Sequence, residues 1–269
     1  MNKVTNAYKN NNLMLFVGAG VSKNLNLPDW SDLINHLADE LGYNKDIFHT
    51  MGDYQSLAEY YIIQKNGIGE LRSWMDLNWH RDMEKKLKKS RIYELITKLN
   101  FPIIYTTNYD NSIEMAHKYY KKDFVKVASV KDIRYIDNNK KQIIKFHGDF
   151  SDDNSIVLTE SSYFDRLDFD TPLDIKFRSD VLGKSILFIG YSLSDINIRF
   201  IFYKLTKIWE ESGQIKNRPP VFIFTNKENP IQEAVLKKRG IEMIVSDVDD
   251  RAKALEDFLS GLIDKNGSF

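Results

Sequence analysis

The 269-residue sequence contains no cysteine, and this absence excludes several kinds of chemistry. Disulfides, thiolate nucleophiles and cysteine-ligated zinc or iron–sulfur sites all require that side chain. The formal net charge is zero, with 38 basic and 38 acidic residues, which argues against direct nucleic-acid binding through a global positive field. No apolar run reaches the roughly 18–20 residues that span a bilayer, and no apolar signal segment is visible at the N-terminus. We therefore expect a cytoplasmic protein with no membrane partner.

The sequence does contain short apolar runs that alternate with amphipathic segments. We predict strands at 13–17, 102–106, 124–127, 143–146, 156–158, 185–189, 221–225 and 241–245. Apolar residues at helical spacing predict helices at 30–41, 195–209, 230–238 and 250–263. Strands rich in β-branched and aromatic residues suit a parallel sheet that is covered on both faces. The predicted fold class is α/β, with a doubly wound, mainly parallel sheet.

The segment from about 45 to 98 carries helical patterns and no convincing strand. We interpret it as a small helical module inserted between the first and second strands. Hydrophobic residues make up 42% of the chain, enough for a substantial core. We predict that residues 1–269 form one domain that contains this insertion.

A glycine turn, Gly18-Ala19-Gly20-Val21-Ser22, directly follows the first predicted strand. Such a turn allows a backbone to approach a phosphate closely. The full G-x-G-x-x-G fingerprint is incomplete, because Lys23 stands where the third glycine would be. The turn is not a Walker A loop either, since no G-x-x-x-x-G-K-[ST] is present.

Small, polar or ionisable residues also follow four other predicted strands. They are Thr106-Thr107-Asn108-Tyr109-Asp110, His147-Gly148-Asp149, Gly190-Tyr191-Ser192-Leu193-Ser194-Asp195 and Thr225-Asn226-Lys227-Glu228. Ligands of doubly wound folds bind at the carboxyl ends of strands, so these segments are the candidate site.

Each candidate also has a structural interpretation. Ser22 and Asp195 could cap helices, and Asn108 and Asp110 could form Asx turns. His147 could be a buried structural histidine, the role we assign to the other four histidines. Its position at a predicted strand end, before a glycine, favours a functional role instead.

Five short motifs resemble, in order, those of the sirtuin family: GAGVS, TTNYD, FHG, IGYSLSD and FTN. They look most like the bacterial sirtuin-like NAD-hydrolysing domains of anti-phage defence systems. This resemblance implies a Rossmann-like fold with a smaller helical module, and NAD as the ligand. It also implies that NAD is the substrate that is cut, which depletes the NAD of the cell.

The resemblance assigns roles residue by residue. Gly18, Ala19, Gly20 and Ser22 would hold the NAD phosphates and the adjoining ribose. Asn108 and Asp110 would lie near the nicotinamide ribose, with His147 as the catalytic base, for which we expect a pKa near its ordinary value of about 6.5. The residues expected to contact the adenosine half are Gly190, Ser192, Thr225 and Asn226.

Protein-deacylating sirtuins generally carry a four-cysteine zinc module after the catalytic histidine, and a chain without cysteine cannot form one. We therefore expect no metal and favour NAD hydrolysis. The alternatives are an NAD-dependent protein deacylase or ADP-ribosyltransferase, or a non-catalytic subunit that senses NAD or ADP-ribose. Family analogy suggests a homo-oligomer and an ATPase or nuclease partner protein.

Overall fold

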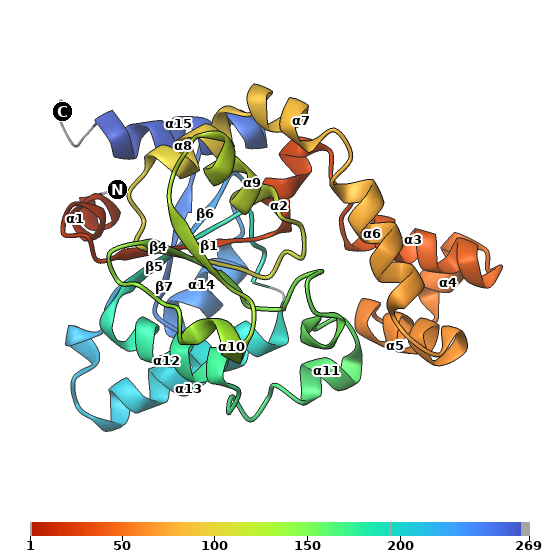
Figure 1. Cartoon of the computed structure of the whole chain (residues 1–269). Helices are drawn as coiled ribbons and strands as arrows, with labels where there is room; N and C mark the ends of the chain where they lie inside the picture. The colour runs from red at the N-terminus through yellow and green to blue at the C-terminus, as the bar shows by residue number, and fades with distance from the viewer. Residues whose placement is uncertain (1, 194, 265–269) are drawn as a thin grey trace.

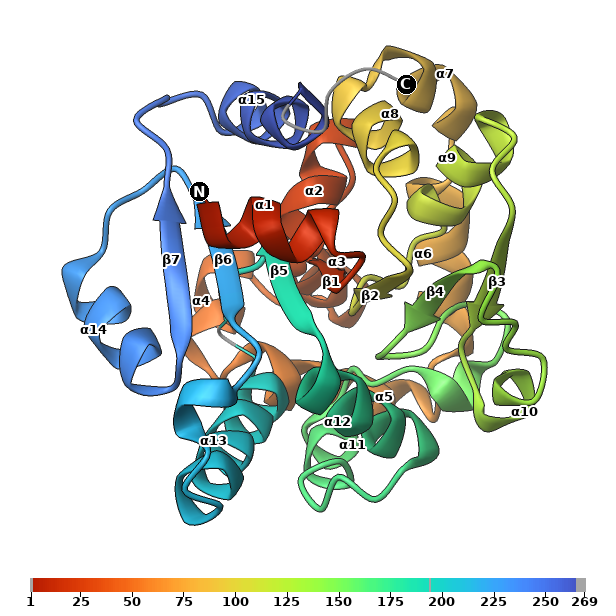
Figure 2. The same cartoon turned by 90° about the vertical axis from the view of Figure 1, so that its left-hand side faces the viewer.

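The computed structural model describes residues 2–193 and 195–264. In this part of the chain, seven parallel strands form one sheet in the order β3-β4-β2-β1-β5-β6-β7 (Figures 1 and 2). The strands are β1 (Leu13–Val17), β2 (Ile103–Thr106), β3 (Phe124–Val127), β4 (Lys141–Lys145), β5 (Ser185–Ile189), β6 (Val221–Thr225) and β7 (Ile241–Val245). From the central β1 the chain builds one side of the sheet, then returns to build the other from β5. This order confirms the predicted doubly wound, Rossmann-like α/β fold.

Alternate residues of β1 face two separate hydrophobic cores. Leu13, Leu15 and Val17 belong to one core, while Met14 and Phe16 belong to the other. All five are almost fully buried. A strand with both faces covered reads as a continuous apolar run, which explains why its bounds follow directly from the sequence.

Helices cover both faces of the sheet. In Figure 2, α1, α8, α9 and α15 lie on one side and α12 and α13 on the other. Their bounds are α1 (Asn2–Lys9), α8 (Arg91–Lys98), α9 (Ser112–Tyr119), α12 (Pro172–Gly183), α13 (Ile196–Glu211) and α15 (Arg251–Asp264). The remaining short elements are α2 (Ala19–Ser22), η1 (Lys23–Leu25), α7 (Met83–Lys89), α10 (Val130–Ile133), η2 (Asp153–Ser155), α11 (Glu160–Phe164), η3 (Ile215–Asn217) and α14 (Pro230–Lys238).

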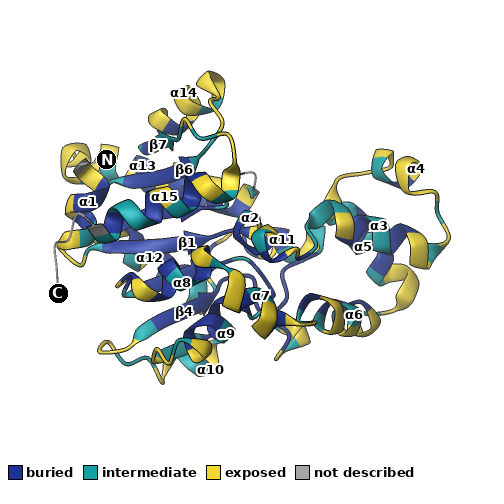
Figure 3. Ribbon diagram, turned by 90° about the horizontal axis from the view of Figure 1, so that it is seen from above, coloured by how far each residue is buried: buried dark blue, intermediate teal, exposed yellow. Residues whose placement is uncertain are grey.

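A small helical lobe projects from the edge of the sheet domain (Figures 1 and 3). It contains α3 (Trp30–Leu41), α4 (Lys45–Thr50), α5 (Tyr54–Lys65) and α6 (Gly69–Trp79). Asp29 starts α3 with a capping box, and Gly42 ends it in the left-handed conformation at φ 77°. By contrast, α7 and α8 lie beside α9 and α15 against the sheet domain. The division of the chain into a single domain with an insertion at about 45–98 stays a prediction.

The strand predicted at 156–158 is wrong. Ile156, Val157 and Leu158 are buried but belong to no strand. Val157 makes one backbone hydrogen bond, to the carbonyl oxygen of His147 at 3.0 Å, rather than a ladder. A run of three apolar residues indicates burial but not strand pairing, so the sequence pattern alone could not distinguish a buried loop from a strand.

Candidate functional site

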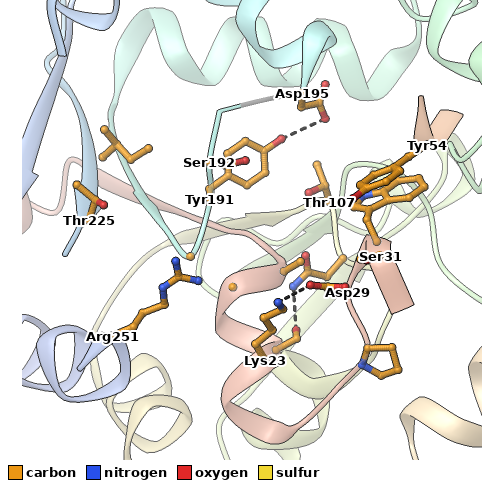
Figure 4. Close-up of a pocket in the computed structure, with 18 of the residues that line it drawn as sticks. Lys23, Asp29, Ser31, Tyr54, Thr107, Tyr191, Ser192, Asp195, Thr225 and Arg251 are labelled. Atoms are coloured by element: carbon orange, nitrogen blue, oxygen red, sulfur yellow. Dashed lines mark hydrogen bonds and ion pairs between the residues drawn. The ribbon is translucent and has the colours of Figure 1, made fainter. Parts of the chain in front are cut away.

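A cleft of about 960 Å³ lies at the carboxyl ends of the strands (Figure 4). Ten of the eleven predicted site residues line it: Ala19, Gly20, Ser22, Asn108, Asp110, His147, Gly190, Ser192, Thr225 and Asn226. Gly18 does not line the cleft, and Ser194 of the fourth motif lies outside the described residues. The cleft is centred where the loops after β1 and β5 meet, which is the switch point of the strand order. Its volume suits a ligand of nucleotide size.

The loops after β1 and β5 pack closely together at three glycines. The amides of Gly18 and Gly20 donate to the carbonyl oxygens of Ile189 and Gly190 at 3.0 and 2.8 Å. A Cβ on Gly18 would lie 2.5 Å from the Gly190 oxygen, and one on Gly20 would lie 2.8 Å from it. Gly190 itself has φ +58°, which disfavours any side chain. These glycines thus have a packing role, and their contact with a phosphate stays a prediction.

The hydroxyl of Ser22 joins Asn108 and Asp110 in one buried group. It donates to Asp110 Oδ2 at 2.9 Å and accepts from Asn108 Nδ2 at 3.0 Å. The capping alternative for Ser22 is wrong, because its side chain makes no capping hydrogen bond. Asp110 does make an Asx-type contact, since its Oδ1 accepts from the Ser112 amide at 3.0 Å.

This group fixes the direction in which the Asn108 amide points. An ionised carboxylate only accepts, so Ser22 gives its single proton to Asp110. The oxygen of Ser22 must then accept from the amino group of Asn108. The carbonyl oxygen Oδ1 of Asn108 therefore remains available to accept a hydrogen bond from a ligand in the cleft.

A buried ion pair contacts the main chain of the loop that carries Asn108. Lys145, at the end of β4, is 0% exposed and donates through Nζ to the main-chain oxygen of Asp110. The same Nζ lies 3.4 Å from Glu114 Oε1, also buried. Neither residue was among the predicted site residues, because Lys145 sits within an apolar strand and gives no periodic signal.

His147 lies at the floor of the cleft with 2% of its surface exposed. The next residue, Gly148, has φ +77°, and a Cβ there would lie 2.1 Å from the Ser155 oxygen, so glycine is required. His147 packs edge-on against Tyr163, with ring centroids 5.3 Å apart. Its Nε2 lies 3.3 Å from Asp195 Oδ2, within ion-pair distance but without the alignment of a hydrogen bond.

The expectation of an ordinary pKa for His147 is wrong. Burial lowers its pKa well below the usual 6.5, and the nearby Arg166 guanidinium lowers it further. Asp174 opposes this effect, but Asp174 is itself engaged in an ion pair with Arg166. His147 is therefore neutral near pH 7, with a lone pair on one ring nitrogen.

Thr225 and Asn226, two of the residues expected to contact adenosine, line the cleft at the carboxyl end of β6. Thr225 Oγ1 accepts from the Lys227 amide at 3.2 Å, and Asn226 Nδ2 donates to the Asp249 oxygen at 2.7 Å. The second bond ties the β6 loop to the segment that leads into α15. A contact of Thr225, Asn226, Ser192 or Gly190 with adenosine stays a prediction.

Further cleft residues come from the helical lobe, from η1 and from α15. Trp30 and Tyr54 of the helical lobe stack with ring centroids 5.9 Å apart and line the cleft. Lys23 forms an ion pair with Asp29, and Arg251 of α15 points into the cleft (Figure 4). Asp29 and Trp30 belong to the segment 27–30, which resembles the sirtuin stretch that covers the nicotinamide side, and both line the cleft.

Within residues 2–193 and 195–264, no cluster of three or more histidine, aspartate or glutamate side chains could hold a metal ion. No helix of the same residues is long and apolar enough to cross a membrane.

A match to a known family model shows which family the chain belongs to. A family model described as a SIR2-like domain matches residues 102–244, more than half of the sequence. The chain belongs to the SIR2-like family. The matched region runs from β2 to β7 and contains Asn108, Asp110 and His147.

Two curated relatives match most of this chain at low sequence identity. The chain is 28% identical over 213 residues to "NAD(+) hydrolase ThsA" of Enterococcus faecium, covering 78% of this chain and 43% of that protein. It is 28% identical over 250 residues to "Defense-associated sirtuin 2" of Bacillus subtilis, covering 90% of this chain and 24% of that protein. The chain thus spans less than half of the length of these relatives.

A solved structure of Sir2 bound to the inhibitor EX-527, 2'-O-acetyl-ADP-ribose and a deacetylated p53 peptide is also similar. It matches with a TM-score of 0.45 and 13% identity over 99% of each chain.

Proposed function

We propose that this chain is an NAD+ hydrolase that cleaves the nicotinamide–ribose bond to give nicotinamide and ADP-ribose. The observation that carries the proposal is the placement of Asn108 and His147 in one cleft at the switch point of the sheet. The name of the Enterococcus faecium relative, an NAD(+) hydrolase, supports it. NAD is the substrate in this proposal, and no metal takes part.

For this reaction the protein needs mainly to place a water molecule and to stabilise positive charge. Nicotinamide is a cationic leaving group, so its departure needs no general acid. The Asn108 Oδ1 would accept a hydrogen bond from the attacking water or a ribose hydroxyl. His147, neutral and buried, would accept the proton from that group, a step that typically contributes about 10²–10⁴-fold. Asp110, through Ser22, would hold Asn108 in position.

The experiment is to incubate the protein with NAD and separate the products by reverse-phase chromatography. We expect nicotinamide and ADP-ribose from the wild type, with a loss of roughly 100-fold or more in Asn108→Ala and His147→Ala. His49→Ala is the matched control, because His49 lies outside the cleft and hydrogen-bonds Asn35. Circular dichroism checks that each variant is folded.

Three outcomes would contradict the proposal. A folded His147→Ala or Asn108→Ala protein that released nicotinamide at the wild-type rate would remove these residues from the reaction. Turnover that required an acylated peptide or a protein acceptor, with the product carried by that acceptor, would instead indicate a deacylase or an ADP-ribosyltransferase. Binding of ADP-ribose without any turnover would indicate a sensing subunit.

We further infer that the protein acts in the cytoplasm, in anti-phage defence, by depleting NAD. The name of the Bacillus subtilis relative, a defense-associated sirtuin, supports this role. A homo-oligomer, and an ATPase or nuclease partner, would control the activity. The helical lobe is the surface we assign to assembly, because it exposes large apolar side chains: Ile47, Met51, Ile63 and Leu77. Native mass spectrometry that found only monomer under all conditions would reject the oligomer.

A further inference from the structure

His147 and Asp195 approach each other from two different strand ends. His147 follows β4, whereas Asp195 precedes α13 and follows the β5 loop. Their side chains are 2% and 9% exposed, and 3.3 Å separates Nε2 from Oδ2. We propose that Asp195 is a positioning residue for His147, whose carboxylate directs the Nε2 proton and stabilises the imidazolium form during the reaction. This inference rests on the proposed NAD hydrolysis.

The carboxylate of Asp195 is held firmly. Its Oδ1 accepts from the amides of Asn197 and Ile198 at 2.9 and 3.3 Å, where it caps α13. Its Oδ2 accepts from the Tyr191 hydroxyl at 3.1 Å (Figure 4). The capping alternative for Asp195 is therefore confirmed, and the cap fixes the orientation of the oxygen that faces His147.

The buried Nε2 of His147 needs a partner. It makes no aligned hydrogen bond, although a buried polar atom without one carries a desolvation cost. Asp195 Oδ2 lies 3.3 Å from it. Contacts of this kind are commonly loose in a free enzyme and tighten when substrate binds.

The other charged and titratable groups near His147 or Asp195 offer no alternative partner for His147. They are Tyr109 after β2, Tyr163 of α11, Tyr191 after β5, Arg166 after α11 and Asp174 of α12. Burial raises the pKa of all three tyrosines, so they stay protonated. Arg166 and Asp174 pair with each other, and among the described residues Asp195 alone forms an ion pair with His147.

The proton balance follows from this geometry. With the Nε2 proton directed at Asp195, the lone pair of the neutral imidazole lies on Nδ1. As water attacks the anomeric carbon, its O–H bond breaks and Nδ1 takes the proton. Nicotinamide leaves with the electron pair of the C–N bond. Asp195 balances the charge of the imidazolium until the proton passes to solvent, a division of roles known from other carboxylate–histidine pairs.

Asp195→Asn tests the pairing without removing the cap, because asparagine caps helices as well as aspartate does. We expect kcat to fall roughly 10- to 1,000-fold, within the contribution of a positioned base. The acid limb of the pH–rate profile should also move to lower pH. A carboxylate beside a histidine raises its pKa, so loss of the charge lowers that pKa and His147 stays unprotonated in more acidic solution.

The matched control is Asp250→Asn. Asp250 occupies the same position before α15, where its Oδ1 accepts from the Lys253 amide at 2.7 Å. Loss of charge at a cap alone should change neither kcat nor the acid limb. An acid limb in Asp195→Asn that coincides with the wild-type limb would overturn the pairing, whatever the loss of rate.

A second measurement needs no NAD. Nuclear magnetic resonance titration of ¹⁵N-histidine-labelled protein follows His147, with the four other histidines as internal references. The pairing requires a lower pKa of His147 in Asp195→Asn than in the wild type, and equal values would refute it. If the wild type releases no nicotinamide but this difference is present, the proposed function fails and the pairing stands.

Discussion

Lys145→Met should destabilise the fold far more than a typical lysine substitution. Lys145 is 0% exposed, and its Nζ lies 3.4 Å from Glu114 Oε1. Coulomb's law at this distance with an effective dielectric constant of about 20 gives about 5 kcal/mol. Removal of one partner from a buried pair typically costs about 3–5 kcal/mol, because the other charge stays buried without compensation. Neither oxygen of Glu114 has a hydrogen-bond partner, so no other group in the described chain would replace the lysine.

The assay is thermal unfolding followed by circular dichroism. With an unfolding entropy of about 2.1 cal/mol/K per residue over a chain of 269 residues, a loss of about 3–5 kcal/mol lowers Tm by about 5–9 °C. The double variant Lys145→Met/Glu114→Leu removes both charges and should recover at least half of that loss. Lys85→Met is the control, because its ion pair with Asp82 is exposed to solvent and should leave Tm unchanged.

Two results would refute this reasoning. The first is a Lys145→Met protein with the wild-type Tm. The second is a double variant whose destabilisation equals the sum of the two single losses, which would show that the charges do not interact. Hydrolysis of NAD should also fall in Lys145→Met, since Lys145 anchors the main chain of Asp110 beside Asn108.

Three further predictions concern the glycine turn, acid stability and the phosphate side of the cleft. Gly20→Ala should lower both Tm and NAD affinity, because its Cβ would lie 2.8 Å from a backbone oxygen of the β5 loop. Gly69→Ala is the control: Gly69 has open space around it, so this variant should change neither Tm nor NAD affinity. Burial, with a smaller effect of nearby lysines, lowers the pKa of His117 to about 4. The unfolded chain therefore binds a proton that the folded chain does not, and the free energy of unfolding should fall by up to about 3 kcal/mol between pH 6.5 and 4. Urea titrations should show a smaller fall in His117→Leu, and equal slopes against pH would contradict this. If the guanidinium of Arg251 contacts the pyrophosphate, Arg251→Gln should raise KM for NAD about tenfold with little change in kcat. Lys253→Gln is the control and should leave KM unchanged. An unchanged KM of Arg251→Gln in steady-state kinetics would reject the contact.

The sheet could be predicted because its central strands are buried on both faces. The predicted strands 185–189 and 221–225 each contain four consecutive apolar residues, and the structure reproduces their bounds. Helix α12 was not among the predicted elements. Its apolar residues do not follow one stripe, although Thr171 and Pro172 mark its start as cap and first residue.

The candidate site could be predicted only as a set of strand ends. The sequence places Asn108, His147 and Asp195 after strands, and parallel strands bring their ends together. It does not show which side chains then touch. The contact between His147 and Asp195 depends on the path of the β5 loop, and the ordinary pKa expected for His147 failed because its burial is a property of the tertiary packing.

The hydrogen bond between the Gly20 amide and the Gly190 oxygen joins a loop near the start of the chain to one in its last third. During synthesis, the glycine turn therefore emerges long before the strand that supports it. The cleft can form only once β5 has left the ribosome and docked beside β1. A nascent chain that ends before residue 185 would carry the GAGVS motif without a nucleotide site. The proposed NAD hydrolysis therefore requires a chain that extends beyond β5.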